Sequence, residues 1–137
     1  MKENYSDESL KGTETILVVE DQAYLLQLVK TSLEELGYKV MTAISPNEAL
    51  LLSKTYPAII HLLLTDVIMP AMSGTELSDE IAKMRPGIKI LFMSGYTSNI
   101  LAPHGVLNKG IHFLQKPFSF AELAKRVRYI LNLNSDE

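Results

Sequence analysis

Residues 62–70 read Leu62-Leu63-Leu64-Thr65-Asp66-Val67-Ile68-Met69-Pro70. The apolar run predicts a strand that is buried on both faces, and the Met-Pro pair predicts that the strand ends just before it. Asp66 is the only carboxylate in this stretch, so we expect it at the carboxyl end of the strand. Open α/β sheets keep their ligand sites outside the carboxyl ends of their strands. Asp66 is therefore the first candidate functional residue.

The composition excludes several classes of protein. Hydrophobic residues make up 47% and charged residues 21% of the 137, which is typical of one globular domain. The net charge of −3 gives no general attraction to nucleic acid or to an anionic membrane. Without cysteine, disulfides, thiolate metal sites and cysteine nucleophiles are excluded. No apolar run reaches the roughly 18 residues that a membrane span needs. We expect a soluble, cytoplasmic domain that contacts neither nucleic acid nor membrane.

Short apolar runs alternate with helical hydrophobic periods along the chain. The expected strands are residues 16–19, 38–43, 59–65, 88–93 and 111–114. Helices are expected over residues 22–36, from Ser45-Pro46 to Tyr56-Pro57, over residues 75–84, over residues 97–109, and from the cap Ser119 through Leu131. Pro103 and Gly105 fall inside the fourth helix, so we expect that helix to be irregular.

This alternation predicts a fold of the α/β class. Five strands and five helical segments predict a flavodoxin-like (βα)5 doubly wound parallel sheet, with strand order 2-1-3-4-5. Residues 1–14 are polar and are interpreted as a flexible leader, residues 15–133 as the domain, and residues 134–137 as a polar tail.

Polar side chains follow four of the expected strands, namely Glu20-Asp21, Asp66, Ser94 and Lys116. In the predicted order these strands are neighbours, so the side chains should converge on one crevice. Three carboxylates in one crevice repel each other unless a cation is present. A hard divalent ion with oxygen ligands answers this need, and Mg²⁺ suits a shallow site with few protein ligands.

The same constellation predicts a chemistry. A metal ion can bridge to a phosphate oxygen and neutralise charge during transfer, which leaves Asp66 as a carboxylate nucleophile that forms an aspartyl phosphate. Lys116 would pair with the new dianion, and the Ser94 hydroxyl would donate a hydrogen bond to it.

Four short motifs carry a resemblance to a known family. They are Glu20-Asp21, Asp66-x-x-Met69-Pro70, Ser94-Gly95 and Lys116-Pro117-Phe118. Together they resemble the receiver domain of two-component response regulators, over about residues 15–133. The wording of residues 92–96 and 113–118 is similar to receivers of hybrid sensor histidine kinases.

The resemblance implies a phosphorelay reaction. A histidine kinase or histidine phosphotransfer protein would donate its phosphoryl group to Asp66. Asp21 and Asp66 would bind Mg²⁺ directly, Glu20 through water, and Ile68 through its main-chain carbonyl. Such a domain is a phosphoacceptor that assists its own phosphotransfer and dephosphorylation rather than an enzyme with a separate substrate. It would be a single-domain regulator, a relay intermediate or part of a hybrid kinase.

The resemblance also implies a conformational switch. Phosphorylation would draw Ser94 inward and turn Phe113 toward the core, and a homodimer is compatible with the family. The irregular fourth helix puts the usual dimer or output surface in doubt. Ile68, Gly95 and Tyr96 would flank the phosphoryl group, and we expect the two large side chains among them to hinder water and to make the phosphate long-lived.

Other functions remain open at this point. A mononucleotide binder on the same fold needs hydroxyls and amides after the first strand, where this chain has two carboxylates. A metal-dependent aspartyl phosphatase needs a general acid close to its nucleophile, and Ile68 cannot protonate a leaving group. A degenerate receiver that acts only as a docking module would keep the fold without the reaction.

Overall fold

The computed structural model describes residues 8–95 and 112–133. Five parallel strands form one sheet in the order β2-β1-β3-β4-β5, which confirms the predicted topology. The strands are β1 (Thr15–Val19), β2 (Lys39–Ala43), β3 (Leu62–Asp66), β4 (Lys89–Ser94) and β5 (His112–Gln115). Because consecutive strands are parallel, their carboxyl ends all lie at one edge of the sheet.

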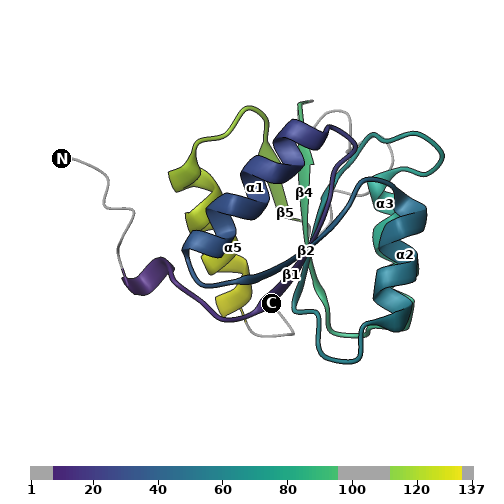
Figure 1. The fold of residues 1–137 in the computed structure, drawn as a ribbon, viewed down its shortest axis with the longest axis horizontal. Helices are drawn as coiled ribbons and strands as arrows, with labels where there is room; N and C mark the ends of the chain where they lie inside the picture. Colours follow the sequence, from purple (N-terminus) through teal and green to yellow (C-terminus); the bar gives the residue numbers. More distant parts are fainter. Residues whose placement is uncertain (1–7, 96–111, 134–137) are drawn as a thin grey trace.

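Helices cover both faces of this sheet (Figure 1). The helices among the described residues are η1 (Glu8–Leu10), α1 (Ala23–Glu35), α2 (Pro46–Thr55), α3 (Gly74–Met84) and α5 (Phe120–Asn132). In Figure 1, α1 and α5 lie on one side of the sheet, and α2 and α3 lie on the other. The expected fourth helix, residues 97–109, lies outside the described residues.

The core has two layers because the central strands are buried on both faces. Every residue of β1 and of β3 is buried. Ile16 and Leu64 belong to the layer that packs against α1 and α5, whereas Leu17 and Leu63 belong to the layer that packs against α2 and α3. Adjacent strand residues point to opposite faces, so unbroken apolar runs are what a doubly covered parallel sheet requires.

Several strand boundaries differ from the sequence-based expectation. β3 begins at Leu62 rather than at Ile59, whose side chain is 66% exposed and lies before the buried stretch. At their carboxyl ends, β3 and β4 each extend one residue further than expected. Asp66 pairs with Met93, and Ser94 pairs with Gln115. The candidate residues Asp66 and Ser94 are thus the last residues of their strands, where the backbone ladder fixes their positions.

Serine residues cap three of the helices. Ser45 accepts a hydrogen bond from the Glu48 amide, as expected from the Ser-Pro signal. Ser73 and Ser119 each form a capping box with the glutamate three residues later. The predicted cap at Ser119 is confirmed; it lies three residues after Lys116 and directly precedes α5.

Within residues 8–14, which belong to the leader expected over residues 1–14, Leu10 and the backbone of Gly12 pack against the rest of the domain. Leu10 in η1 is 8% exposed and belongs to the core layer of α1 and α5. The Gly12 amide donates to the Leu36 carbonyl at 3.0 Å. Because the segment is mostly polar, its composition did not indicate that Leu10 would be buried. Residues 1–7 lie outside the described residues.

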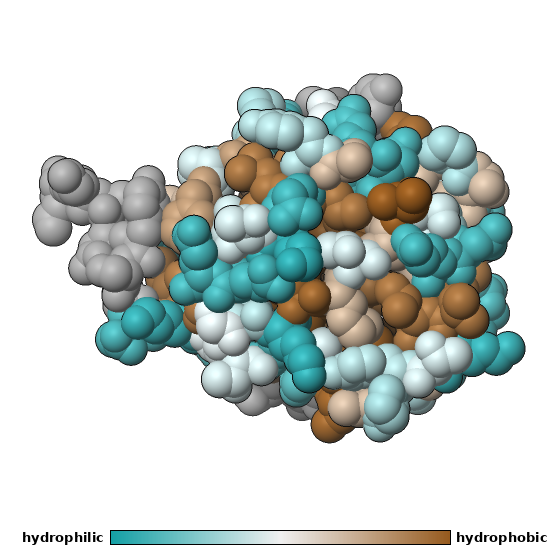
Figure 2. Space-filling view, viewed as in Figure 1, coloured by the Kyte–Doolittle hydropathy of each residue, from teal (hydrophilic) through white to brown (hydrophobic). Residues whose placement is uncertain are grey.

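The visible surface mixes hydrophilic and hydrophobic side chains (Figure 2). A group of hydrophobic residues lies over α2 on this face. Leu51 of α2 is 60% exposed, which agrees with this view. None of the helices in the described part of the chain is long and apolar enough to cross a membrane.

Candidate functional site

Three acidic residues meet at the carboxyl edge of the sheet. Glu20 and Asp21 follow β1, and Asp66 ends β3. One carboxylate oxygen from each of them lies within 4.8 Å of the others. Glu20 is fully buried and Asp66 is 8% exposed, whereas Asp21 is exposed. The convergence that strand order predicted is therefore present in the structure.

Lys116 joins this cluster from the end of β5. Its Nζ lies 2.9 Å from Glu20 Oε1 and 3.2 Å from Asp66 Oδ1. Its amide donates to the Ser94 carbonyl at 2.7 Å, and the Lys116–Pro117 peptide is cis. A single ammonium thus contacts two of the three carboxylates, although the lysine and Glu20 are 96 residues apart in the chain.

Burial governs the electrostatics of the cluster. Burial raises the pKa of Asp66 and that of Glu20, and the contacts with Lys116 only partly oppose this. For Lys116 burial acts to lower the pKa, but the hydrogen bond to Glu20 and the charge of Asp66 outweigh it, so the pKa is raised. The two buried acids are therefore harder to ionise than ordinary carboxylates, and the lysine holds its proton firmly.

The donor set fits a hard divalent cation. It offers oxygen atoms only, from three carboxylates that lie close together. Their raised pKa values show that one ammonium does not fully compensate the acids, so an additional cation would stabilise their ionised forms. Oxygen ligands and an open rim at Asp21 suit Mg²⁺, which keeps part of its water shell.

The loop after Asp66 winds tightly back onto it. The Val67 amide donates to Asp66 Oδ1 at 3.1 Å and to the Met93 carbonyl at 3.0 Å. The Gly74 amide donates to the Val67 carbonyl at 2.7 Å. A Cβ at Gly74 would collide with the carbonyl oxygen of Asp66, so only glycine allows this approach. Ala71 holds a positive φ of 77° in the same loop.

Gly74 was not identified from the sequence as a residue of the site. Its contact partner is the backbone of Asp66, eight residues earlier, and no hydrophobic period marks such a contact. The serine-glycine pair before the helical period indicates where a helix begins, but it does not indicate that Gly74 contacts Asp66.

The other expected site residues lie around the same edge. Ser94 is 2% exposed at the end of β4. Ile68 is 52% exposed on the loop after Asp66, and Gly95 is exposed, with open space where a side chain would be. Tyr96 lies outside the described residues.

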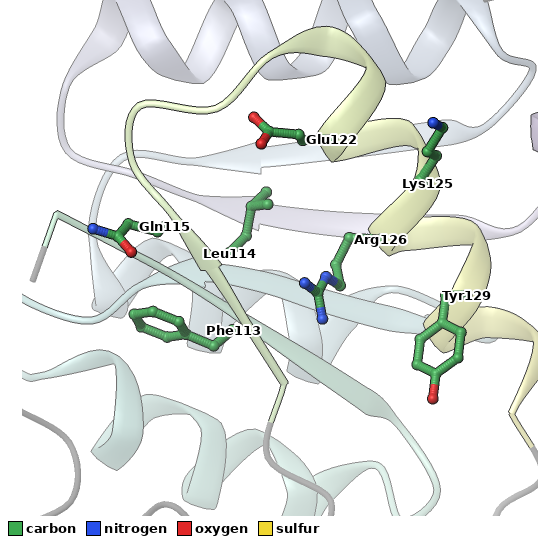
Figure 3. A pocket seen from close by; sticks show the side chains of 7 residues that line it. All are labelled: Phe113, Leu114, Gln115, Glu122, Lys125, Arg126 and Tyr129. Atoms are coloured by element: carbon green, nitrogen blue, oxygen red, sulfur yellow. The ribbon is translucent and has the colours of Figure 1, made fainter. Parts of the chain in front are cut away.

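Phe113 lies on β5, away from the acids. It is partly buried and packs against the small cluster of Val67 and Phe92. Figure 3 shows it beside a hollow of about 670 Å³ that β5 and α5 border among the described residues. The side chain therefore packs against the cluster that includes Val67, the residue that follows Asp66, and it also borders an open space.

Comparisons with known proteins agree with this geometry. The family model for the response regulator receiver domain matches residues 16–128. The chain is 35% identical over 122 residues to the sensor kinase CckA of Brucella abortus, and this match covers 89% of the chain but only 13% of the kinase. It is 30% identical over 116 residues to the response regulator receiver protein CpdR of the same organism, of which it covers 95%. The chain thus corresponds to a small part of some relatives and to nearly the whole of another.

Solved structures show the same likeness. The receiver domain of the hybrid histidine kinase CckA has a TM-score of 0.74 at 31% identity, and the match covers 86% of this chain and 99% of that one. A CheY-like receiver domain protein of Methanospirillum hungatei has a TM-score of 0.78 at 31% identity, with 88% and 95% coverage.

Proposed function

This chain belongs to the response regulator receiver domain family, and from that premise we propose that Asp66 is the residue that accepts the phosphoryl group. The domain is a receiver of two-component signalling. Within it, we assign charge stabilisation of the transferred group to Lys116 and a hydrogen bond to that group to Ser94. The assignment rests on where each side chain lies relative to Asp66.

The proposed step forms one bond and breaks one. An Asp66 carboxylate oxygen attacks phosphorus, while the P–N bond to the donor imidazole breaks and its electron pair stays on the imidazole nitrogen. Among the described residues, the contacts from Lys116 and from the Val67 amide both fall on Oδ1. We therefore assign the attack to Oδ2. As the phosphoryl group arrives, its negative charge favours movement of Lys116 from Glu20 toward the new anion.

Mg²⁺ is the proposed cofactor. Asp21 and Asp66 would hold it directly, Glu20 through water, and Ile68 through its main-chain carbonyl. When bound, it supplies positive charge that balances the acids and the oxygens of the transferring group. The chain's own part is to hold those acids together: the Gln22 amide donates to Glu20 Oε2 at 3.1 Å, and the Gly74 contact fixes the backbone of Asp66.

The observation that carries this proposal is the position of Lys116. An ammonium 3.2 Å from a strand-end carboxylate and 2.9 Å from a second, buried one is ready to pair with a phosphoryl group on Asp66. A lysine that only forms a stabilising ion pair needs one acid. Here the lysine contacts two acids, and a third lies in the same crevice.

We further propose that the donor is a phosphohistidine on a histidine kinase or a histidine phosphotransfer protein. Receiver domains act with such partners, and one relative is itself a sensor kinase. The switch would run through Ser94 and Phe113, because Phe113 packs against the cluster of Val67 and Phe92, and Val67 follows Asp66 in the chain.

The test is a phosphorylation assay on the full chain. The protein is incubated with Mg²⁺ and phosphoramidate, a small donor with a P–N bond, and its intact mass is measured. We expect one added phosphoryl group in the wild type, much less when EDTA removes the metal, and none in Asp66→Asn. An adduct that persists in Asp66→Asn would move the acceptor elsewhere.

The alternatives are not favoured. A docking module without chemistry does not require Lys116 to contact Asp66. An aspartyl phosphatase needs a proton donor beside the nucleophile, and the side chain two residues beyond Asp66 is the exposed hydrocarbon of Ile68.

A further inference from the structure

Residues 8–14 fasten the start of the chain to the seam between α1 and α5. We call these residues, together with their partners Tyr38 and Arg128, the N-terminal clasp. Figure 1 shows η1 beside the C-terminal half of α5. Leu10 fills the seam, since it is 8% exposed within the core layer of α1 and α5. The clasp lies at the edge of the sheet opposite to Asp66, because Thr15 begins β1 and Lys39 begins β2.

Arg128 of α5 is the centre of the clasp. Its guanidinium donates to both carboxylate oxygens of Glu14, at 2.7 and 3.2 Å. It also donates to the Lys11 carbonyl at 3.0 Å and to the Tyr38 hydroxyl at 3.2 Å. The side chains of Arg128 and Glu14 are only 14% and 23% exposed. A bidentate contact between arginine and a carboxylate that is buried to this degree fixes the relative orientation of the two side chains as well as the distance between them.

The backbone of the clasp fits closely. A Cβ at Gly12 would collide with the side chains of Arg128, Tyr38 and Glu14, so any larger residue there would have to displace the clasp contacts. The Gly12 amide donates to the Leu36 carbonyl at 3.0 Å, and the Lys39 amide donates to the Glu14 carbonyl at 3.0 Å. The segment is therefore held by α1, by β2 and by α5 together.

α5 connects this clasp to the acidic site. Its cap Ser119 follows Lys116 by three residues, and Arg128 lies in its C-terminal half. The helix has 13 residues and is about 20 Å long at 1.5 Å per residue. One end of a rigid rod thus follows the site lysine, while the other end holds residues 8–14.

We propose that phosphorylation of Asp66 opens the N-terminal clasp through a displacement of α5, so that the seam under Leu10 is covered in the unphosphorylated domain and exposed in the phosphorylated one. This inference rests on the proposed function. Here Lys116 is held between Glu20 and Asp66, and the clasp is closed. A phosphoryl group draws Lys116 away from Glu20 and moves the residues that lead into α5. Hydrogen bonds at 2.7 to 3.2 Å tolerate little displacement, so the Glu14–Arg128 contact loosens.

Linkage makes the coupling reciprocal. If phosphorylation weakens the clasp, then weakening the clasp favours the phosphorylated form at equilibrium by the same factor, because the reciprocity holds for free energies and not for rates. The proposal is therefore open to test from both ends of α5.

The experiment is hydrogen exchange on the full chain, with intact mass measured on the same samples. The wild type is compared alone, with Mg²⁺, and with Mg²⁺ plus phosphoramidate. We expect peptides that cover residues 8–14 to exchange about fivefold faster or more in the phosphorylated form, the lower end of typical couplings between sites. Mg²⁺ alone should leave this exchange unchanged.

Three variants complete the test. Arg128→Ala should exchange fast at residues 8–14 in both states, so that phosphorylation no longer changes this exchange. Arg126→Ala is the matched control, because Arg126 is exposed on another side of α5, in the wall of the hollow of Figure 3, and should behave as the wild type. Glu14→Gln weakens the same contact without removing the arginine stem, and it replaces Arg128→Ala if that variant does not fold.

The outcomes separate the two proposals. If an adduct forms at Asp66 but exchange at residues 8–14 stays unchanged or becomes slower, the clasp is only structural and this inference fails, while the proposed function stands. A phosphorylation-dependent increase in exchange at residues 8–14 that stays as large in Arg128→Ala as in the wild type leads to the same conclusion. If no adduct forms on the wild type, the proposed function fails and the inference fails with it.

Discussion

Asp66 and Glu20 are acids that the protein buries at a cost. Burial raises the pKa of each, and the ammonium of Lys116 compensates them only in part. Because the pKa of Asp66 is higher in the folded than in the unfolded chain, its ionised form lowers the stability of the metal-free protein. This loss is present above the folded pKa and is relieved as the pH falls through it.

We expect Asp66→Asn to stabilise the metal-free protein. Asparagine has nearly the same shape without the charge, so the free energy of unfolding in EDTA at pH 7 should rise by about 1 kcal/mol, an ordinary size for one substitution. Mg²⁺ should raise the stability of the wild type more than that of Asp66→Asn, because the wild type binds the ion more tightly. Urea unfolding with and without Mg²⁺ measures both effects. A variant less stable than the wild type in EDTA would contradict this account.

Ile68 is the second residue for which we make a testable prediction. Its side chain is 52% exposed beside Asp66, and we expect it to keep water from the phosphoryl group. Ile68→Asn should shorten the lifetime of the phosphate about tenfold, which corresponds to about 1.4 kcal/mol in the barrier. The decay of the adduct is followed by intact mass after the donor is removed.

Ile59→Asn is the control for this prediction. Ile59 is 66% exposed and precedes β3, so it lies toward the opposite edge of the sheet. Its substitution should leave the lifetime unchanged. A lifetime unchanged or longer in Ile68→Asn would show that this side chain does not shield the phosphate.

At the scale of elements, the loop between β3 and α3 positions the acceptor. Gly74 starts α3 and lies against the carbonyl of Asp66, while the Ser73–Glu76 capping box closes the helix start. The loop therefore links the position of α3 to that of Asp66, the proposed acceptor.

We expect Gly74→Ala to lower both stability and phosphorylation. The methyl group must push the loop away from Asp66, which should cost about 1–3 kcal/mol, as overpacking does elsewhere. The displaced Asp66 should also take up the phosphoryl group more slowly. Urea unfolding and the rate of adduct formation measure the two effects.

Gly87→Ala separates the two effects. Gly87 has a φ of 94° but open space around a Cβ, so alanine should cost about 1–2 kcal/mol from backbone conformation alone. It precedes β4, away from the acids, and phosphorylation should proceed at the wild-type rate. If Gly74→Ala also kept that rate, the loop would not position the acceptor.

At the scale of the whole molecule, the two edges of the sheet hold different groups of residues. The carboxyl edge collects the acids and Lys116, and the opposite edge holds the N-terminal clasp. α5 spans the distance between these two edges, which is what the proposed switch requires. We expect the contacts of the clasp to contribute to the stability of the fold as well.

The stability of the clasp should depend on pH through Glu14. The hydrogen bond from Arg128 lowers the pKa of Glu14 below its ordinary value of 4.5, although burial opposes this. A lowered folded pKa means that the stabilisation is fully present above the unfolded pKa and is lost as the pH falls through the folded value. Above pH 4.5, Glu14→Gln should therefore be less stable than the wild type by about 1.5 kcal/mol, as expected for hydrogen bonds to a charged group.

Unfolding curves between pH 3 and pH 7 measure this difference, which should shrink toward the acid end. Glu8→Gln is the control in the same segment, because the Glu8 side chain is 85% exposed in its pair with Lys11 and such pairs contribute little. A difference between Glu14→Gln and the wild type that stayed constant with pH would show that the charge of Glu14 is not what holds the clasp.

The sequence by itself determined the order of elements, the parallel topology and the convergence of Glu20, Asp21, Asp66 and Lys116. These features follow from local patterns: apolar runs, helical periods, serine caps and polar residues at strand ends. Only the tertiary structure decided the clasp, in which Glu14 and Arg128 meet across 114 residues, and the contact of Gly74 with Asp66. Neither contact has a local signature, because each depends on how separate elements pack after they have formed. For the same reason the polar sequence of residues 8–14 resembled a flexible leader. Its one leucine, Leu10, is buried only because α1 and α5 pack together and form the seam that it fills.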